Sequence, residues 1–321
     1  MYKRSVIAPA GIVMIAALVS ACGGGDDDPD IVELAQDRGG FSALLAAAQK
    51  AGLADELADD SASLTVFAPT DAAFAALATQ LGFADATAMV NALPASALAS
   101  ILSYHVLPSE KKAAALVAGG ATQGTLYTFG GTAATVAVDA TSGVKLTDGA
   151  LTTATVTSAD LEARNGVVHA IDKVLVPPGV LNVVQMAQVN PAFSSLVGAV
   201  TQAGLAGTLS GAGPFTVFAP VNSAFAAIAG VVGGLSATQL QTVLTYHVVG
   251  GTVLSSGIPF GQPVATVAGQ PITITAGPAP AIASITDTTA TPAKIVAVDV
   301  RASNGVIHVI DKVLLPTLGG N

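Results

Sequence analysis

The feature that most constrains this chain is an internal duplication. The segments 165–177 and 304–316 are identical at 10 of 13 positions, and each difference exchanges one aliphatic residue for another. Three shorter motifs precede each segment in the same order: Ala-Gly-Leu from 51 and 203, Thr-Val-Phe-Ala-Pro from 65 and 216, and Tyr-His-Val from 104 and 246. The copies lie 139 to 152 residues apart, long enough for a globular domain each and too long for one repeat of a solenoid. The sequence therefore predicts tandem domains at 31–177 and 178–316, a stiff Pro-Pro-Gly junction at 177–179, and a tail at 317–321.

The first part of each copy carries helix signals. Asp-Ile-Val-Glu at 30–33 and Asn-Val-Val-Gln at 182–185 predict capping boxes, because the first side chain can accept from a free backbone N–H while the fourth bonds back. Farther along, Asp71 and Asn222 follow the proline of the Thr-Val-Phe-Ala-Pro motif. They are the residues there that can cap a helix in both copies, so we predict the N-cap of a later helix at this position.

The second part of each copy has the pattern of strands. From about residues 122 and 252 onward, Thr, Val, Gly and Pro dominate, with alternating stretches such as 134–138 and 272–275. Asn165-Gly166 and Asn304-Gly305 predict hairpin turns that lead into a final apolar strand. Helices followed by mostly antiparallel strands indicate an α+β fold rather than a doubly wound sheet.

The N-terminal 30 residues have the pattern of a lipoprotein leader. Lys3 and Arg4 precede an apolar stretch that ends in small residues directly before Cys22, the one cysteine of the chain. This resembles the bacterial lipobox, which predicts a signal peptide at 1–21, acyl chains such as palmitate on Cys22, and a flexible tether at 22–30. We expect a lipid anchor in the cell envelope, at the outer membrane or cell surface, with a periplasmic face or a secreted protein with a free thiol as alternatives.

Charge and composition exclude several classes of function. Lys and Arg number 12 against 21 Asp and Glu, so the net charge of −9 disfavours nucleic acid as a partner. Trp is absent, and Phe and Tyr together number 14, which leaves few aromatic side chains for base stacking. One cysteine allows neither an internal disulfide nor a cysteine-ligated metal or cluster. The sequence predicts no cofactor.

The repeated motifs together resemble the fasciclin (FAS1) domain. The resemblance implies two tandem copies of a β-sandwich or wedge of about seven mostly antiparallel strands flanked by helices, and a role in adhesion or extracellular recognition. It also implies candidate adhesion residues in each copy, namely an Asp–Ile-type dipeptide before the Asn-Gly turn and the Tyr-His pair. These fall at Asp160, Leu161, Asp299 and Val300, and at Tyr104, His105, Tyr246 and His247. The alternative for all eight is a structural role, with the Asp side chains bonded to backbone or solvent and the others packed in the core.

Catalytic patterns are weak in this sequence. Each copy holds two histidines about 60 residues apart, without spacing that would place two metal ligands on one face, and His169 and His308 sit among apolar strand residues. We predict no enzyme, and a surface-anchored protein whose two domains bind a protein or polysaccharide on a matrix or cell surface. The alternatives are an envelope protein that binds a small apolar or sugar ligand, and a hydrolase, which would need a Ser or Asp beside one of the histidines.

Overall fold

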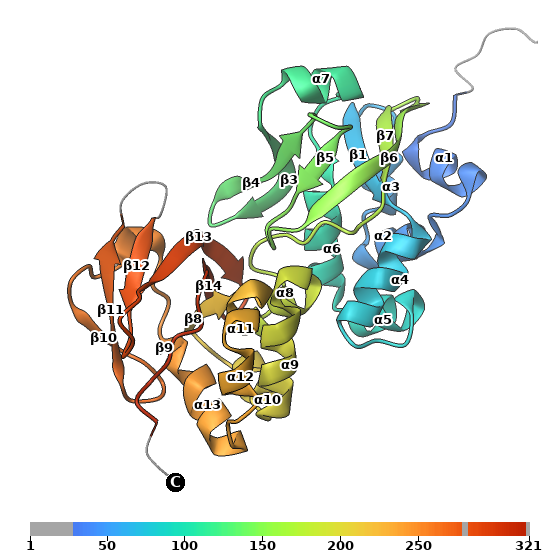
Figure 1. The fold of residues 1–321 in the computed structure, drawn as a ribbon. Coiled ribbons are helices and arrows are strands. Elements are labelled where there is room, and N and C mark those ends of the chain that lie inside the picture. Colours follow the sequence, from blue (N-terminus) through green and yellow to red (C-terminus); the bar gives the residue numbers. More distant parts are fainter. Residues whose placement is uncertain (1–27, 278–281, 319–321) are drawn as a thin grey trace, which may run out of the picture.

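The computed structural model describes residues 28–277 and 282–318, which form two α+β domains joined end to end (Figure 1). The predicted signal peptide at 1–21, Cys22, the tether as far as residue 27 and the last three residues of the tail lie outside the described residues. In the part of the chain that is described, no single helix has the length and hydropathy to cross a membrane. One pair of helices, Ala86–Ala92 and Ala95–Tyr104, has that length and hydropathy only when taken together, and the two are bent by 116° relative to each other.

Helices form the first layer of each domain. In the first domain they are α1 (Ile31–Arg38), α2 (Ser42–Ala51), α3 (Ala54–Leu57), α4 (Asp71–Gln80), α5 (Ala86–Ala92), α6 (Ala95–Tyr104) and α7 (Ala113–Ala118). In the second domain they are α8 (Val183–Val189), α9 (Ser194–Gln202), α10 (Ala206–Ser210), α11 (Asn222–Ala227), α12 (Ala229–Val232) and α13 (Ala237–Tyr246), with 3-10 turns η1 (Pro191–Phe193) and η2 (Ser255–Gly257).

Both predicted capping boxes are confirmed, at the start of α1 and of α8. The N-cap predicted at Asp71 and Asn222 is wrong. The helix begins one residue earlier, with Thr70 as its N-cap in the first copy, where the Thr70 hydroxyl accepts from the N–H of Ala73. The Asp71 carboxylate instead accepts from the N–H of Ala43 at 2.8 Å, in the first turn of α2. Asn222 bonds the first turn of α9 in the same way, so these side chains do cap a helix, but a neighbouring one.

Strands form the second layer. They are β1 (Leu64–Pro69), β2 (Val106–Leu107), β3 (Thr122–Phe129), β4 (Thr132–Asp139), β5 (Lys145–Thr147), β6 (Thr153–Ala163) and β7 (Gly166–Ile171) in the first domain. The second domain has β8 (Phe215–Pro220), β9 (Val248–Gly250), β10 (Pro263–Ala265), β11 (Pro271–Ala276), β12 (Ala283–Thr286), β13 (Ala293–Ala302) and β14 (Gly305–Ile310).

The strand order is the same in both domains. It is β2-β1-β7-β6-β5-β4-β3 in the first and β9-β8-β14-β13-β12-β11-β10 in the second. Every neighbouring pair is antiparallel except the parallel pairs β1–β7 and β8–β14. The long strand β6 pairs with β5 through its first three residues and with β7 from Val156 onward, past two shifts of register. One strand thus belongs to both halves of a bent sheet, which confirms the predicted wedge of seven mostly antiparallel strands.

The predicted hairpins are present, with turns one residue earlier than expected. The two residues that link β6 to β7 are Arg164 and Asn165, and Gly166 already belongs to β7. The Asn165 side chain is buried; it accepts from the N–H of Ile31 and donates to the carbonyls of Leu57 and Asp59. Asn304 repeats these bonds in the second domain. The Asn therefore fixes the turn to the first helix of its own domain.

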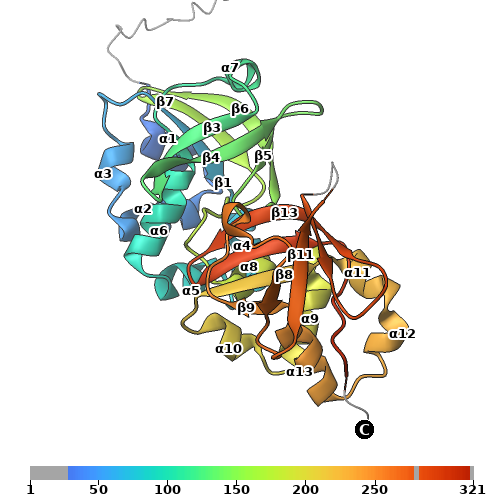
Figure 2. The ribbon, with the colours of Figure 1, turned by 90° about the vertical axis from the view of Figure 1, so that its left-hand side faces the viewer.

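The apolar core continues from one domain into the other. A separate cluster fills each bent sheet, but the cluster beneath the helices extends through both domains. At the boundary, α4 packs against α8 (Figure 2). The shared cluster there includes buried apolar side chains such as Val176 and Val189. Burial of apolar surface at this boundary stabilises the two domains as a pair.

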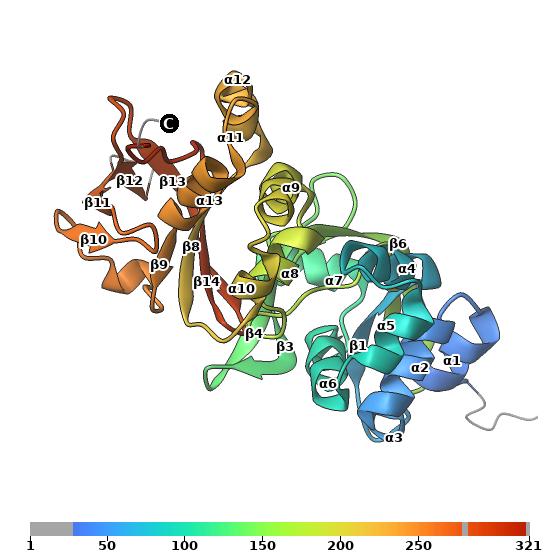
Figure 3. The ribbon, with the colours of Figure 1, turned by 90° about the horizontal axis from the view of Figure 1, so that it is seen from below.

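The Pro-Pro-Gly junction is bonded to both domains. The hydroxyl of Tyr127 donates to the carbonyl of Pro178 at 3.0 Å, and the N–H of Gly179 donates to the carbonyl of Arg301 at 3.0 Å. Gly179 has φ +79°, and a Cβ there would lie 2.2 Å from Cε2 of Phe129, so the Phe129 ring packs directly on the linker backbone. Phe129 is the last residue of β3 and lies next to the turn of the β3–β4 hairpin. Figure 3 shows this hairpin beside β14 of the second domain.

Candidate functional site

A Tyr-His pair ends α6 and α13. The Tyr104 side chain is fully buried, and its hydroxyl donates to the carbonyl of Thr135 at 2.8 Å. Tyr246 is buried to the same degree, and its hydroxyl donates to the carbonyl of Pro271 at 3.1 Å. Each phenol therefore joins the last turn of a helix to a strand of the sheet, and neither reaches the molecular surface.

The histidine of each pair bonds to backbone through both ring nitrogens. In His105, Nδ1 lies 2.7 Å from the carbonyl of Ile101, and Nε2 lies 2.8 Å from the N–H of Leu175. Because a carbonyl can only accept and an N–H can only donate, the ring is neutral with its proton on Nδ1. His247 bonds Val243 and Leu314 in the same way. Burial lowers the pKa of both imidazoles to about 4.

The second pair of histidines, His169 in β7 and His308 in β14, has the opposite tautomer. Nε2 of His169 donates to the carbonyl of Lys111 at 2.9 Å, and Nδ1 accepts from the N–H of Asp160 at 3.2 Å. His308 makes the equivalent bonds, and burial lowers its pKa. Each ring also stacks on a phenylalanine of the neighbouring parallel strand, with centroids 5.8 and 5.6 Å apart.

The Asp of each candidate dipeptide closes a loop against the sheet. Asp160 and Asp299 have φ of +57° and +59°, a left-handed conformation that Asp tolerates better than most residues, at shifts of register in β6 and β13. The Asp160 carboxylate accepts from the N–H of Ala113 at 2.7 Å, and that of Asp299 from the N–H of Ser255 at 2.9 Å. The shift of register thus directs the Asp160 carboxylate to the segment after β2, and the Asp299 carboxylate to the segment after β9.

The structure separates the eight candidate adhesion residues into two groups. Six are buried in the core: Leu161, Val300, Tyr104, His105, Tyr246 and His247. The two Asp side chains are open to solvent in part, and that of Asp160 is 41% exposed. Of these eight residues, only Asp160 and Asp299 can be contacted directly by a partner that binds the folded domains.

Sequence reasoning missed two further Asp residues that hold each domain together. The carboxylate of the buried Asp148 accepts from the N–H groups of Ala150, Thr152 and Val176, and burial raises its pKa despite these bonds. In the second copy, Asp287 bonds Thr289, Leu315 and Lys312. Burial opposes ionisation there too, but these bonds keep the pKa of Asp287 below its ordinary value. A short signal existed in the sequence, because each of these Asp residues follows a Thr, at 147–148 and at 286–287.

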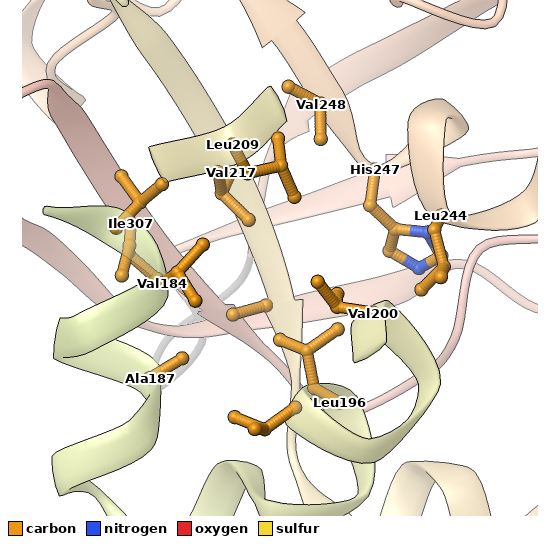
Figure 4. A pocket seen from close by; sticks show the side chains of 13 residues that line it. Val184, Ala187, Leu196, Val200, Leu209, Val217, Leu244, His247, Val248 and Ile307 are labelled. Carbon is orange, nitrogen blue, oxygen red and sulfur yellow. The ribbon is translucent and has the colours of Figure 1, made fainter. Parts of the chain in front are cut away.

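Each domain encloses a small apolar cavity between its first two long helices and the sheet. In the second domain the cavity has a volume of about 30 Å³, and side chains of α8, α9, β8 and β14 converge on it, among them Val184, Leu196 and Val217 (Figure 4). The equivalent cavity of the first domain has about 40 Å³. A water molecule needs about 10–15 Å³ of such space, whereas ligand pockets measure roughly 300–1,000 Å³. Neither of these two cavities therefore has room for the small apolar ligand of the alternative function.

The histidines and the buried polar side chains of the described residues bond to other groups of the protein. All eight ring nitrogens of the four histidines lie within bonding distance of backbone groups. Within the described ranges, no three His, Cys, Asp or Glu side chains gather as metal ligands, and no buried side-chain N or O lacks a partner. A hydrolase needs an imidazole nitrogen free to accept a proton from a nucleophile, and these rings do not offer one.

Comparison with known proteins gives consistent matches. A family model described as the fasciclin domain matches residues 39–177 and 191–316. Protein sll1483 of Synechocystis sp. is 39% identical over 180 residues, which cover 54% of this chain and 93% of that protein. The fasciclin-like arabinogalactan protein elcF of Phaeosphaeria nodorum is 30% identical over 262 residues, 79% of this chain and 78% of that protein. A solved FAS1 domain pair from the insect cell adhesion molecule Fasciclin I aligns with a TM-score of 0.43 and 19% identity, over 89% of this chain and 95% of that one.

Proposed function

Because the chain belongs to the fasciclin domain family and carries two copies of the domain in tandem, we propose that it is an adhesion or recognition protein for a matrix, cell-surface or polysaccharide partner. The relative elcF is named a fasciclin-like arabinogalactan protein, and this name supports including a polysaccharide among the proposed partners. The observation that carries the proposal is that the polar side chains of the repeated motifs bond to their own backbone in both copies. What each domain offers to its surroundings is then its outer surface.

The proposal includes a lipid anchor outside the cytoplasm. Its support is the sequence before the first domain: a basic start, an apolar stretch, and Cys22 preceded by small residues. Acyl chains on Cys22 would hold the domains at an envelope membrane, and the Gly- and Asp-rich tether would let them stand away from it.

Two variants in the producing cell test adhesion and anchorage separately. An in-frame deletion of 31–316 keeps the leader and Cys22 but removes both domains, and we expect attachment to a matrix-coated surface to fall to background. Cys22→Ser keeps both domains, and we expect it to move the protein from the detergent phase to the aqueous phase in a detergent partition. Normal attachment by the deletion strain would refute the adhesion proposal. Intact acylation in the mass spectrum of the Cys22→Ser protein, or unchanged partition, would refute the anchor alone.

A further inference from the structure

A groove at the domain junction is much larger than the two apolar cavities. It has a volume of about 480 Å³, against about 30 and 40 Å³ for those two. Phe129 of the first domain lines it together with the loop before β8 (212–214), Thr252 and the β13–β14 turn (301–305). Its volume lies in the range of small-ligand sites, roughly 300–1,000 Å³. We call it the junction groove.

The walls of the junction groove are held in place by the linker. Phe129 packs on the backbone of Gly179, whose N–H donates to the carbonyl of Arg301, another residue of the groove. Tyr127, two residues before Phe129, donates to Pro178. Phe129 of the first domain and the residues of the second domain that line the groove are therefore held relative to each other through Pro178 and Gly179. A site with fixed walls loses little conformational entropy when a ligand binds.

The junction groove contains a cation without a carboxylate partner. Arg301 is half-buried and takes part in none of the ion pairs formed among the described residues. The carboxylate closest to it in sequence, Asp299, is bonded to Ser255. At the equivalent position of the first domain, where β6 pairs with β7, the residue is Glu162, and Lys112 neutralises it. This position thus carries a negative charge in the first domain and a positive charge in the second. Only the charge of the second domain has no ion-pair partner among the described residues.

The second domain as a whole does not repel an anion. Residues 178–316 contain three basic residues (Lys294, Arg301, Lys312) and three acidic ones (Asp287, Asp299, Asp311), so their formal charge is zero, and the net charge of −9 belongs to the rest of the chain. An acidic ligand that approaches the second domain therefore meets no net formal charge, and Arg301 there has no ion-pair partner among the described residues.

We propose that the junction groove binds an acidic glycan, a sugar chain that carries a uronate carboxylate. The guanidinium of Arg301 matches a carboxylate in a two-bond geometry. The Phe129 ring offers a flat apolar surface for the C–H face of a sugar ring. Thr252 and Ser303 supply hydroxyls that can exchange hydrogen bonds with sugar hydroxyls. This inference rests on the proposed function, and it assigns to that function a site and a chemical class of partner.

Calorimetric titration of the full chain with Cys22→Ser tests the site. The probe is a tetrasaccharide of β-1,4-linked glucuronate, and cellotetraose is its neutral counterpart. We expect the uronate to bind and Arg301→Gln to weaken it by about tenfold or more, because hydrogen bonds between ions are lost. Arg301→Lys should keep part of the affinity, and Phe129→Leu should weaken both sugars by a similar factor. The matched control is Glu162→Gln at the equivalent position of the first domain, which should change neither affinity.

The outcomes separate the groove from the adhesion function. Absence of binding to the glucuronate tetrasaccharide, equal affinity for cellotetraose, or unchanged affinity in folded Arg301→Gln would each overturn the proposal for the groove. If cells with Arg301→Gln still attach normally while the 31–316 deletion does not, the groove proposal fails and the adhesion function stands. If the deletion strain attaches normally but the purified chain binds the uronate through Arg301, the adhesion function fails and the groove proposal stands.

Discussion

At the scale of single residues, the four histidines hold each domain together as neutral hydrogen-bonding groups. Each copy uses both tautomers: the histidine after the helix carries its proton on Nδ1, and the histidine in the last strand carries it on Nε2. A second proton on either ring would face a backbone N–H, which can only donate. Protonation therefore requires the loss of one of these bonds.

This arrangement predicts acid sensitivity in a defined range. The pKa of His105 and of His247 is about 4 in the folded state and 6.5 in the unfolded state, so between these values the unfolded chain binds more protons. The free energy of unfolding should then fall as the pH drops from about 6.5 to about 4, by about 3 kcal/mol for each histidine. Urea titrations at pH 7, 6, 5 and 4.5 measure this slope. The control is the double variant His105→Gln, His247→Gln, which should be less stable at pH 7 and have a flatter slope; equal slopes would contradict the prediction.

Short-range residue signals were predictable from the sequence, and long-range ones were not. The capping boxes involve partners three residues apart, so the sequence contains the whole interaction. Asp71 bonds the N–H of Ala43, 28 residues upstream, and no local pattern distinguishes this from a cap of its own helix. The candidate adhesion residues were identified by motif alone, and the motif does not tell that six of them are buried. The junction groove joins Phe129 to Arg301, 172 positions apart, and only the fold brings these residues together.

At the scale of elements, the one parallel strand pair of each described sheet depends on a glycine. Gly166 opens β7 beside Leu64 of β1, and Gly305 opens β14 beside Phe215 of β8. A Cβ at these positions would lie 2.1 and 2.2 Å from the carbonyl oxygens of Leu64 and Phe215. The Asn-Gly dipeptide, which the sequence suggested as a turn, thus serves two functions: Asn fixes the turn to a helix, and Gly allows the close approach of two strands.

We expect Gly166→Ala to destabilise the first domain by about 3 kcal/mol or more, because backbone atoms cannot move away without breaking the β1–β7 ladder. Gly124→Ala in β3 is the matched control: the added Cβ would meet only the Cβ of Ala133, at 3.9 Å, so its stability should be equal or slightly higher. Urea denaturation followed by circular dichroism measures both. Similar stability of the two variants would show that the close approach is not needed.

At the scale of the whole molecule, the domains form a pair with a shared core cluster and a bonded linker. We expect calorimetry of the native chain to show one unfolding transition. Gly179→Ala forces the Phe129 ring off the linker and strains a residue with φ +79°, so the transition should divide into two. Gly198→Ala in α9, where a Cβ would have nothing within 4 Å, is the control and should keep one transition. A single transition in Gly179→Ala would indicate that the α4–α8 contact alone couples the domains.

The parallel pairing of β1 with β7 and of β8 with β14 has a consequence for a protein under mechanical load. If the proposed anchor holds the N-terminal end while the domains are bound to a surface, tension enters each domain near its first strand and leaves after its last. In a parallel pair these two points lie at opposite ends of the ladder, so the pull runs along the strands and loads all six residue pairs at once. Resistance to such a pull is set by the rate of unfolding rather than by equilibrium stability. Both domains would thus withstand drag in flowing liquid better than their modest size suggests.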